Sequence, residues 1–158
     1  MGAKKNKDIR ISALLKEKHI SLDLQETEKK EVLTELVELI AGSKKKILLK
    51  SVLEREKLGS TGIGGGVAIP HAKTEAVKNF VLAFGRKNEG VDFGALDGEK
   101  TYLFFVFASP KNEVENHLKI LAEISRLVKD KFTVELLKKA DSKDKVMKII
   151  KEMESRSK

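Results

Sequence analysis

Three histidines, His19, His71 and His117, are the side chains in this sequence best suited to carry a proton or a chemical group near neutral pH. His71 directly follows Pro70 and a glycine-rich stretch, and five of the eleven glycines lie between positions 59 and 66. Proline fixes its own backbone and keeps the preceding residue extended, while glycines let the backbone approach another group closely. The spacing indicates a histidine displayed to a partner, although a plain turn that ends in Pro-His is the alternative interpretation.

The surroundings of His117 suggest a different role. It is expected in the first turn of a helix over residues 113–130, on the face that also carries Leu121 and Ile124. A helix N-terminus favours an anion such as phosphate and would lower the pKa of a histidine, so that a neutral imidazole could donate a hydrogen bond there. A core histidine with satisfied hydrogen bonds is the alternative. We interpret His19, in a predicted strand near Lys and Glu residues, as a surface residue.

Several common kinds of site are excluded by the sequence. It contains no cysteine, which excludes disulfides, thiolate zinc sites, iron–sulfur clusters and a cysteine nucleophile. The glycine run has neither the Gly-Lys-Ser/Thr ending of a Walker A loop nor the third glycine of Gly-x-Gly-x-x-Gly, and no Gly-x-Ser-x-Gly elbow occurs. His71 and His117 lie 46 positions apart without a nearby second ligand, so no metal site is expected.

Composition predicts a single globular domain with a basic surface. The chain has 158 residues, a hydrophobic fraction of 41% and a net charge of +8. It has one Tyr, no Trp and no nucleic-acid-binding motif, so we expect a solvated lysine-rich surface and no nucleic-acid partner. The longest apolar run, residues 102–108, is far below the roughly 18 residues that span a bilayer. We see no secretory signal and expect a cytoplasmic protein without direct membrane insertion.

Strand-like and helical patterns are interleaved along the chain, which predicts an α/β (α+β) fold. The domain is expected over residues 8–154, after a disordered basic tail at residues 1–7. It should contain a mixed sheet of about four to five strands with helices on both faces. The run at 101–108 is apolar throughout, as in a central strand buried on both faces.

The other predicted elements follow from hydrophobic spacing and end signals. Two further strands are predicted, over residues 19–24 and 79–86. Thr27 and Ser43 are expected to cap the first two helices, and Gly42 is expected to close the first of them. Later helices are predicted over residues 113–130, 134–139 and 142–153.

Residues 55–71, which read Arg-Glu-Lys-Leu-Gly-Ser-Thr-Gly-Ile-Gly-Gly-Gly-Val-Ala-Ile-Pro-His, resemble the active-site signature of type-2 enzyme IIA domains. These domains belong to the phosphoenolpyruvate-dependent sugar phosphotransferase system (PTS) and include fructose, mannitol and nitrogen-regulatory forms. Residues 90–98 and 115–124 are similar to the family's central stretch and its second-histidine helix. The resemblance covers residues 9–153, and three segments in the family's order are more specific than any one alone.

The resemblance implies a phosphohistidine carrier with the family's mixed sheet and flanking helices. In such proteins the histidine matching His71 accepts a phosphoryl group from the histidine-containing phosphocarrier protein HPr and passes it to a cysteine of an enzyme IIB domain during sugar uptake. The histidine matching His117 supports the phosphoryl group, and no nucleotide, metal or other cofactor is implied. One alternative is a nitrogen-regulatory IIA that signals by phosphorylation-dependent binding to a target protein. Another is a non-catalytic binding module on the same fold.

Three further residues of the signature have side chains suited to a phosphoryl group. Arg55 has a permanent charge and forked donors, which favour charge neutralisation at phosphoryl oxygens. Its alternative is an ordinary surface arginine at a helix end. Ser60 and Thr61 could donate hydroxyl or backbone N–H hydrogen bonds to the same oxygens, and loop capping is the alternative for both.

Overall fold

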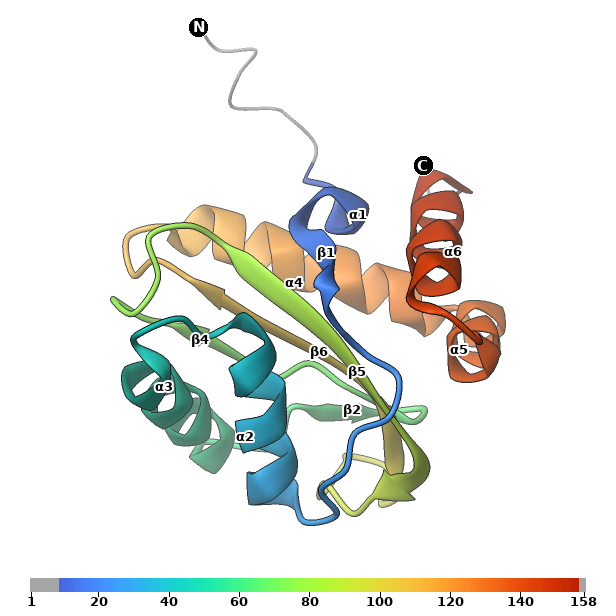
Figure 1. Cartoon of the computed structure of the whole chain (residues 1–158), viewed down its shortest axis with the longest axis horizontal. Helices are drawn as coiled ribbons and strands as arrows, with labels where there is room; N and C mark the ends of the chain where they lie inside the picture. Colours follow the sequence, from blue (N-terminus) through green and yellow to red (C-terminus); the bar gives the residue numbers. More distant parts are fainter. Residues whose placement is uncertain (1–8, 157–158) are drawn as a thin grey trace, which may run out of the picture.

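One mixed β-sheet forms the middle layer of the structure, a computed structural model that describes residues 9–156 (Figure 1). Its strands are β1 (Leu15–Ser21), β2 (Gly62–Gly64), β3 (Val67–Ala68), β4 (His71–Lys73), β5 (Val81–Val91) and β6 (Thr101–Ser109). They are ordered β1-β5-β6-β3-β2, and β4 also pairs with β6. β1 runs parallel to β5, and β3 and β4 run parallel to β6, whereas the β5–β6 and β2–β3 pairs are antiparallel.

Helices cover both faces of this sheet. They are α1 (Ile11–Leu14), α2 (Lys29–Ile40), α3 (Lys45–Lys57), α4 (Val114–Lys129), α5 (Lys131–Lys139) and α6 (Lys143–Arg156). α2 and α3 pack on one face, and α1, α4, α5 and α6 lie on the other (Figure 1). No helix within residues 9–156 is long and apolar enough to cross a membrane.

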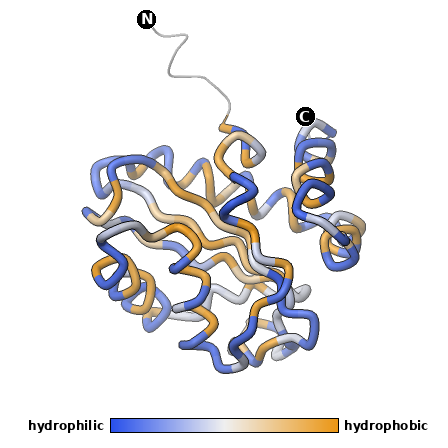
Figure 2. Tube along the Cα trace, viewed as in Figure 1, coloured by the Kyte–Doolittle hydropathy of each residue, from blue (hydrophilic) through white to orange (hydrophobic). Residues whose placement is uncertain are grey.

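β6 is the centre of the core because both of its faces are buried. Successive side chains of a strand point to opposite faces. One set, Leu103, Phe105 and Phe107, joins the core beneath α4, α5 and α6, and the other set, Phe104, Val106 and Ala108, joins the core beneath α2 and α3. Figure 2 shows the apolar residues concentrated along these inner strands and the polar residues on the outer parts of the helices.

The predicted fold class is confirmed: a mixed sheet lies between helices on both faces. The sheet has six strands rather than four or five, because residues 62–73 contribute three very short strands that show no hydrophobic alternation. The predicted strand at 19–24 is observed as β1, which begins at Leu15 and ends at Ser21. The expected domain limits stay a prediction, and the expected tail of residues 1–7 lies outside the described residues.

The predicted helix caps are wrong in detail. α2 has Glu28 and α3 has Lys44 at the N-cap position, instead of Thr27 and Ser43, and neither cap side chain makes a capping hydrogen bond. Gly42 lies one residue beyond the C-cap of α2 and does not have a positive φ. Helices within a folded domain are stabilised mainly by the packing of their apolar faces, so these two form without the expected caps.

Gly85 on β5 makes a close contact between the sheet and α2. A Cβ added there would lie 2.4 Å from Leu36 Cδ2 and 2.9 Å from Leu24 Cδ1. We therefore expect Gly85→Ala to lower the free energy of unfolding by about 1–3 kcal/mol through overpacking, measured by urea denaturation. Gly42→Ala is the matched control, because nothing lies within 4 Å of its added Cβ. Equal losses of stability in the two variants would contradict this account.

Candidate functional site

A groove of about 630 Å³ lies where α3 and α4, which belong to opposite layers, both reach β4. Arg55 from α3, His71 and Lys73 from β4, and His117 from α4 all line it. The structure thus brings together the two histidines and the arginine that the sequence singled out.

The backbone around Pro70 determines where His71 lies. β3 and β4 both pair with β6, and Pro70 between them has no N–H to give to the ladder, so the strand is interrupted there. The Pro70 carbonyl accepts a hydrogen bond from Phe107 N at 3.0 Å, and His71 lies opposite Phe107 in the β4–β6 register. The imidazole consequently stacks on the Phe107 ring, with centroids 5.5 Å apart and 18° between the planes.

One hydrogen bond fixes the tautomer of neutral His71. Its Nδ1 lies 2.7 Å from the carbonyl oxygen of Ile69. A carbonyl can only accept, so Nδ1 carries the proton and donates it. The lone pair of the neutral ring is therefore on Nε2, which makes Nε2 the nucleophilic atom of His71.

His117 lies in the first turn of α4, close to His71. It is only 4% exposed, and its ring centroid is 5.3 Å from that of His71 and 4.8 Å from that of Phe107. Its Nδ1 is hydrogen-bonded to the hydroxyl of Ser109, a fully buried residue of β6. This hydroxyl is buried and makes no other hydrogen bond within residues 9–156, so its O–H is satisfied only by donation to Nδ1. We infer that neutral His117 carries its proton on Nε2. Sequence reasoning did not single out Ser109 as a site residue.

Burial and nearby positive charges keep both histidines neutral. Burial, with the neighbouring His71 and Lys73 acting in the same direction, lowers the pKa of His117 to about 4. Burial also lowers the pKa of His71, against its hydrogen bond to the Ile69 carbonyl; the charges of Arg55 and Lys73 lower this pKa as well, and the charge of Glu56 raises it. The pKa of His117 moves in the direction predicted for a helix N-terminus, but the main cause is burial.

Three cations line this groove: Arg55, Lys57 and Lys73. Arg55 is in the last turn of α3, where its Nη1 donates to the Gly59 carbonyl at 2.9 Å. Lys73 is exposed and lies two residues after His71 on β4, so both side chains are on the same side of the strand. Sequence reasoning missed Lys73, although its spacing from His71 was a usable signal once residues 71–73 were taken as a strand.

Ser60 and Thr61 do not line the groove. The Ser60 hydroxyl donates to the Phe93 carbonyl at 2.9 Å and accepts from Gly62 N at 3.0 Å. Thr61 is buried, and its N–H and hydroxyl donate to the Glu56 carboxylate at 2.8 and 2.6 Å. Both residues stabilise the loop through these hydrogen bonds, which is the alternative stated for them in the sequence analysis. Their position gives no support to a contact with a phosphoryl group.

Other conspicuous features of the sequence lie away from the groove. Gly64, Gly65 and Gly66 have positive φ and form the turn between β2 and β3, where Gly65 N donates to the Asp97 carboxylate at 3.0 Å. These glycines shape a hairpin and do not open a path to His71. His19 lies on β1, where it is half-buried rather than a surface residue. Across residues 9–156, no three His, Asp or Glu side chains are gathered so as to hold a metal ion.

The fold and the paired histidines define a class of protein, the type-2 enzyme IIA domains. Residues 13–153 match the family described as "Phosphoenolpyruvate-dependent sugar phosphotransferase system, EIIA 2". The chain belongs to this family, whose members are phosphotransfer components of that system.

Relatives carry two kinds of name. The chain is 37% identical over 146 residues to the "PTS system fructose-specific EIIABC component" of Bacillus subtilis, covering 90% of this chain and 23% of that protein. It is also 37% identical over 110 residues to the "Nitrogen regulatory protein" of Bradyrhizobium diazoefficiens, covering 68% of this chain and 72% of that protein. The chain thus spans about a quarter of the first relative (23%) and most of the second.

Solved structures agree with this assignment. The nitrogen regulatory protein IIA-Ntr of Neisseria meningitidis superposes with a TM-score of 0.84 at 34% identity, covering 89% of this chain and 98% of that one. Enzyme IIA-mannitol of Escherichia coli, solved in complex with phosphorylated enzyme IIB-mannitol, superposes with a TM-score of 0.72 at 25% identity, covering 88% and 99%.

The buried position of His117 makes its protonation testable. We expect an NMR titration to give it a pKa near 4 and to place His71 below the ordinary value of 6.5. In the unfolded chain both residues take up a proton near 6.5. The folded state therefore binds fewer protons between pH 6.5 and about 4, so the contribution of His117 to stability is lost as pH falls through this window. A His117 midpoint near 6.5 would contradict the burial of its neutral form.

The hydrogen bond from Ser109 predicts which nitrogen of His117 is protonated. Nitrogen-15 NMR of the wild type should show the proton on Nε2, and Ser109→Ala should produce a mixture of the two neutral tautomers because the donor to Nδ1 is lost. Ser125→Ala, on the same helix, is the control and should leave the wild-type spectrum unchanged. Protonation of Nδ1 in the wild type would refute the assignment.

Proposed function

We propose that this protein is a phosphohistidine relay. It accepts a phosphoryl group from HPr on Nε2 of His71 and passes it to a cysteine of an enzyme IIB domain during phosphoenolpyruvate-dependent sugar uptake. The observation that carries the proposal is a neutral histidine whose Nδ1 is held by the Ile69 carbonyl, in a groove lined by permanent positive charges. Membership of the EIIA 2 family supports it.

The proposed transfer needs no proton movement at His71. The bond between phosphorus and Nε2 forms while the bond between phosphorus and the donor's histidine nitrogen breaks, and that nitrogen keeps the electron pair. Nδ1 keeps its proton, and the Ile69 carbonyl stabilises the positive charge that the ring gains. In the second step a thiolate of the IIB domain forms the new sulfur–phosphorus bond, and Nε2 recovers its electron pair.

The other residues of the groove supply charge and position, which phosphoryl transfer requires more than covalent chemistry from the protein. Arg55 and Lys73 neutralise the charge on the phosphoryl oxygens. His117 donates a hydrogen bond from Nε2–H to one of these oxygens. Because both rings are neutral near pH 7, the nucleophile keeps its lone pair while the donor keeps its proton.

The margin of the groove suits protein partners. Leu58 is 85% exposed and Leu118 is 58% exposed, and both line the groove beside the histidines. Exposed apolar side chains around a reactive group are typical of protein–protein contact surfaces. We propose that HPr and the IIB domain dock here in turn.

A regulatory role is the second candidate, and the names of relatives favour it specifically. The Bradyrhizobium relative and the Neisseria structure are both called nitrogen regulatory proteins. In this reading His71 is phosphorylated in the same way, but the phosphoryl group is a mark that changes the binding of a target protein. A non-catalytic binding module is the third hypothesis. It does not explain why His71, His117 and Arg55 line the same groove.

Intact-protein mass spectrometry tests the proposal. The protein is mixed with phosphoenolpyruvate, enzyme I and HPr, and we expect it to gain one acid-labile phosphoryl group. His71→Ala should gain none. His117→Ala and Arg55→Gln should still be phosphorylated but at least about tenfold more slowly, which corresponds to about 1.4 kcal/mol of lost transition-state stabilisation. His19→Ala, a histidine outside the groove, is the control and should match the wild type.

A second step separates relay from regulation. Phosphorylated protein is mixed with the IIB domain of a fructose-specific permease, and transfer to its cysteine supports the relay. Retention of the group on His71, with the same IIB domain shown to accept from another IIA, supports the regulatory role. If HPr phosphorylates another acceptor but not His71, the relay and the regulatory role are both contradicted. The non-catalytic binding module is then the remaining hypothesis.

A further inference from the structure

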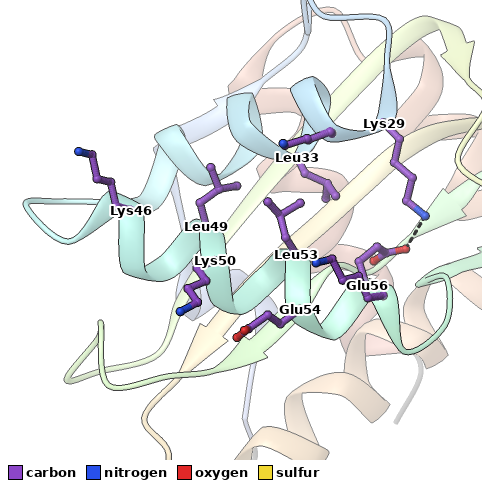
Figure 3. A pocket seen from close by; sticks show the side chains of 10 residues that line it. Lys29, Leu33, Lys46, Leu49, Lys50, Leu53, Glu54 and Glu56 are labelled. Atoms are coloured by element: carbon purple, nitrogen blue, oxygen red, sulfur yellow. Dashed lines mark ion pairs between the residues drawn. The ribbon is translucent and has the colours of Figure 1, made fainter.

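A second groove lies between α2 and α3, whereas the His71 groove lies between α3 and α4 (Figure 3). It has a volume of about 750 Å³. Leu33 of α2 and Leu49 and Leu53 of α3 point toward one another and form its floor. Leu33 is buried, and the two leucines of α3 are partly exposed. The result is a recessed apolar strip between two helices.

Lysines surround this strip. Five lysines and only two glutamates line the groove. Lys29 is already engaged, since its Nζ lies 2.9 Å from the Glu56 carboxylate and donates to the Phe93 carbonyl at 3.0 Å. The other four are exposed, and among residues 9–156 none has a carboxylate within ion-pair distance; they are Lys30, Lys46, Lys50 and Lys57. The margin therefore presents uncompensated positive charge from both helices.

The backbone of the groove determines what kind of chain can fill it. Its lining residues belong to α2 and α3, whose N–H and C=O groups are largely used within those helices. A peptide that binds as an added β-strand needs a free sheet edge for its backbone hydrogen bonds, and this groove offers none. A helix satisfies its backbone internally and packs its side-chain ridges between those of two neighbouring helices.

We propose that this groove docks an acidic amphipathic helix of a partner protein. Apolar side chains of that helix at positions i, i+3, i+4 and i+7 would cover the leucine floor, and its glutamates or aspartates would pair with the exposed lysines. Lys46 and Lys57 lie near opposite ends of α3, about 16 Å apart along its axis, which matches about three turns of a docked helix. The proposal goes beyond the proposed function and does not depend on transfer at His71.

Charge and shape together favour this partner over other anionic surfaces. A membrane-binding face presents its apolar side chains outward, whereas the floor here is recessed and Leu33 is 1% exposed. A nucleic acid would use the lysines but leave the leucine strip without a complement.

The test uses a synthetic peptide and the full-length protein. The peptide is a capped helix of about 14 residues with leucines on one face and glutamates beside them. We expect it to shift the backbone NMR signals of α2 and α3, and to bind at least about tenfold more tightly than a peptide of the same composition with the leucines spread around the helix. The double variant Lys46→Glu with Lys50→Glu should weaken binding at least about tenfold.

The matched control is Lys145→Glu with Lys151→Glu. Both lysines are exposed on α6, on the opposite face of the sheet, and the pair makes the same change in net charge. The loss of peptide affinity in this α6 double variant should be at least about fivefold smaller than the loss in Lys46→Glu with Lys50→Glu. Equal binding of the two peptides, equal effects of the two charge reversals, or NMR shifts centred on the His71 groove would each overturn the proposal. Binding to phosphatidylglycerol vesicles that requires Lys46 and Lys50, without peptide binding, would overturn it in favour of a membrane surface.

Discussion

The pairing of β4 with β6 directly after Pro70 is the constraint on which the candidate site depends. It places His71 opposite Phe107, so the imidazole has a ring beneath it and the Ile69 carbonyl beside its Nδ1. Ser109 follows Phe107 by two residues on β6, so both side chains lie on the same face of the strand. On that face the Ser109 hydroxyl is hydrogen-bonded to the second imidazole, that of His117. One buried central strand thus supports both histidines, and the tautomer of each is set by a hydrogen bond at Nδ1.

The electrostatics of the groove follow from this arrangement. Packing against β6 removes both imidazoles from much of the solvent, and the resulting cost of a buried charge is the main reason why their pKa values are low. The positive charges come instead from Arg55 and Lys57 of α3 and Lys73 of β4; Arg55 is partly exposed and both lysines are exposed. Neutral rings next to permanent cations suit an anionic group that must bond to a lone pair, because a protonated histidine would have no lone pair to offer.

The sequence predicted those parts of the structure that leave a local or periodic signal. β6 was predicted from its unbroken apolar run, and His71, His117 and Arg55 from motifs that occur in the order of a known family. β2, β3 and β4 were missed because strands of two or three residues are too short to show a period of two. Ser109 was missed because its contact with His117 exists only once α4 has packed over β6.

α3 is the wall between the two grooves, and its composition reflects both. Leu48 and Val52 of α3 pack into the core, Arg55 lines the histidine groove, and Leu49 and Leu53 line the groove beside α2. Three faces of this helix therefore make contacts or line a groove, instead of one apolar face opposite one solvated face. Glu54 and Lys57 line both grooves. Under the two proposals, a phosphoryl group at His71 and an acidic helix beside α3 are both anionic and share the charge of Lys57. Each would therefore weaken the binding of the other, and linkage requires the free energy of this coupling to be the same in both directions.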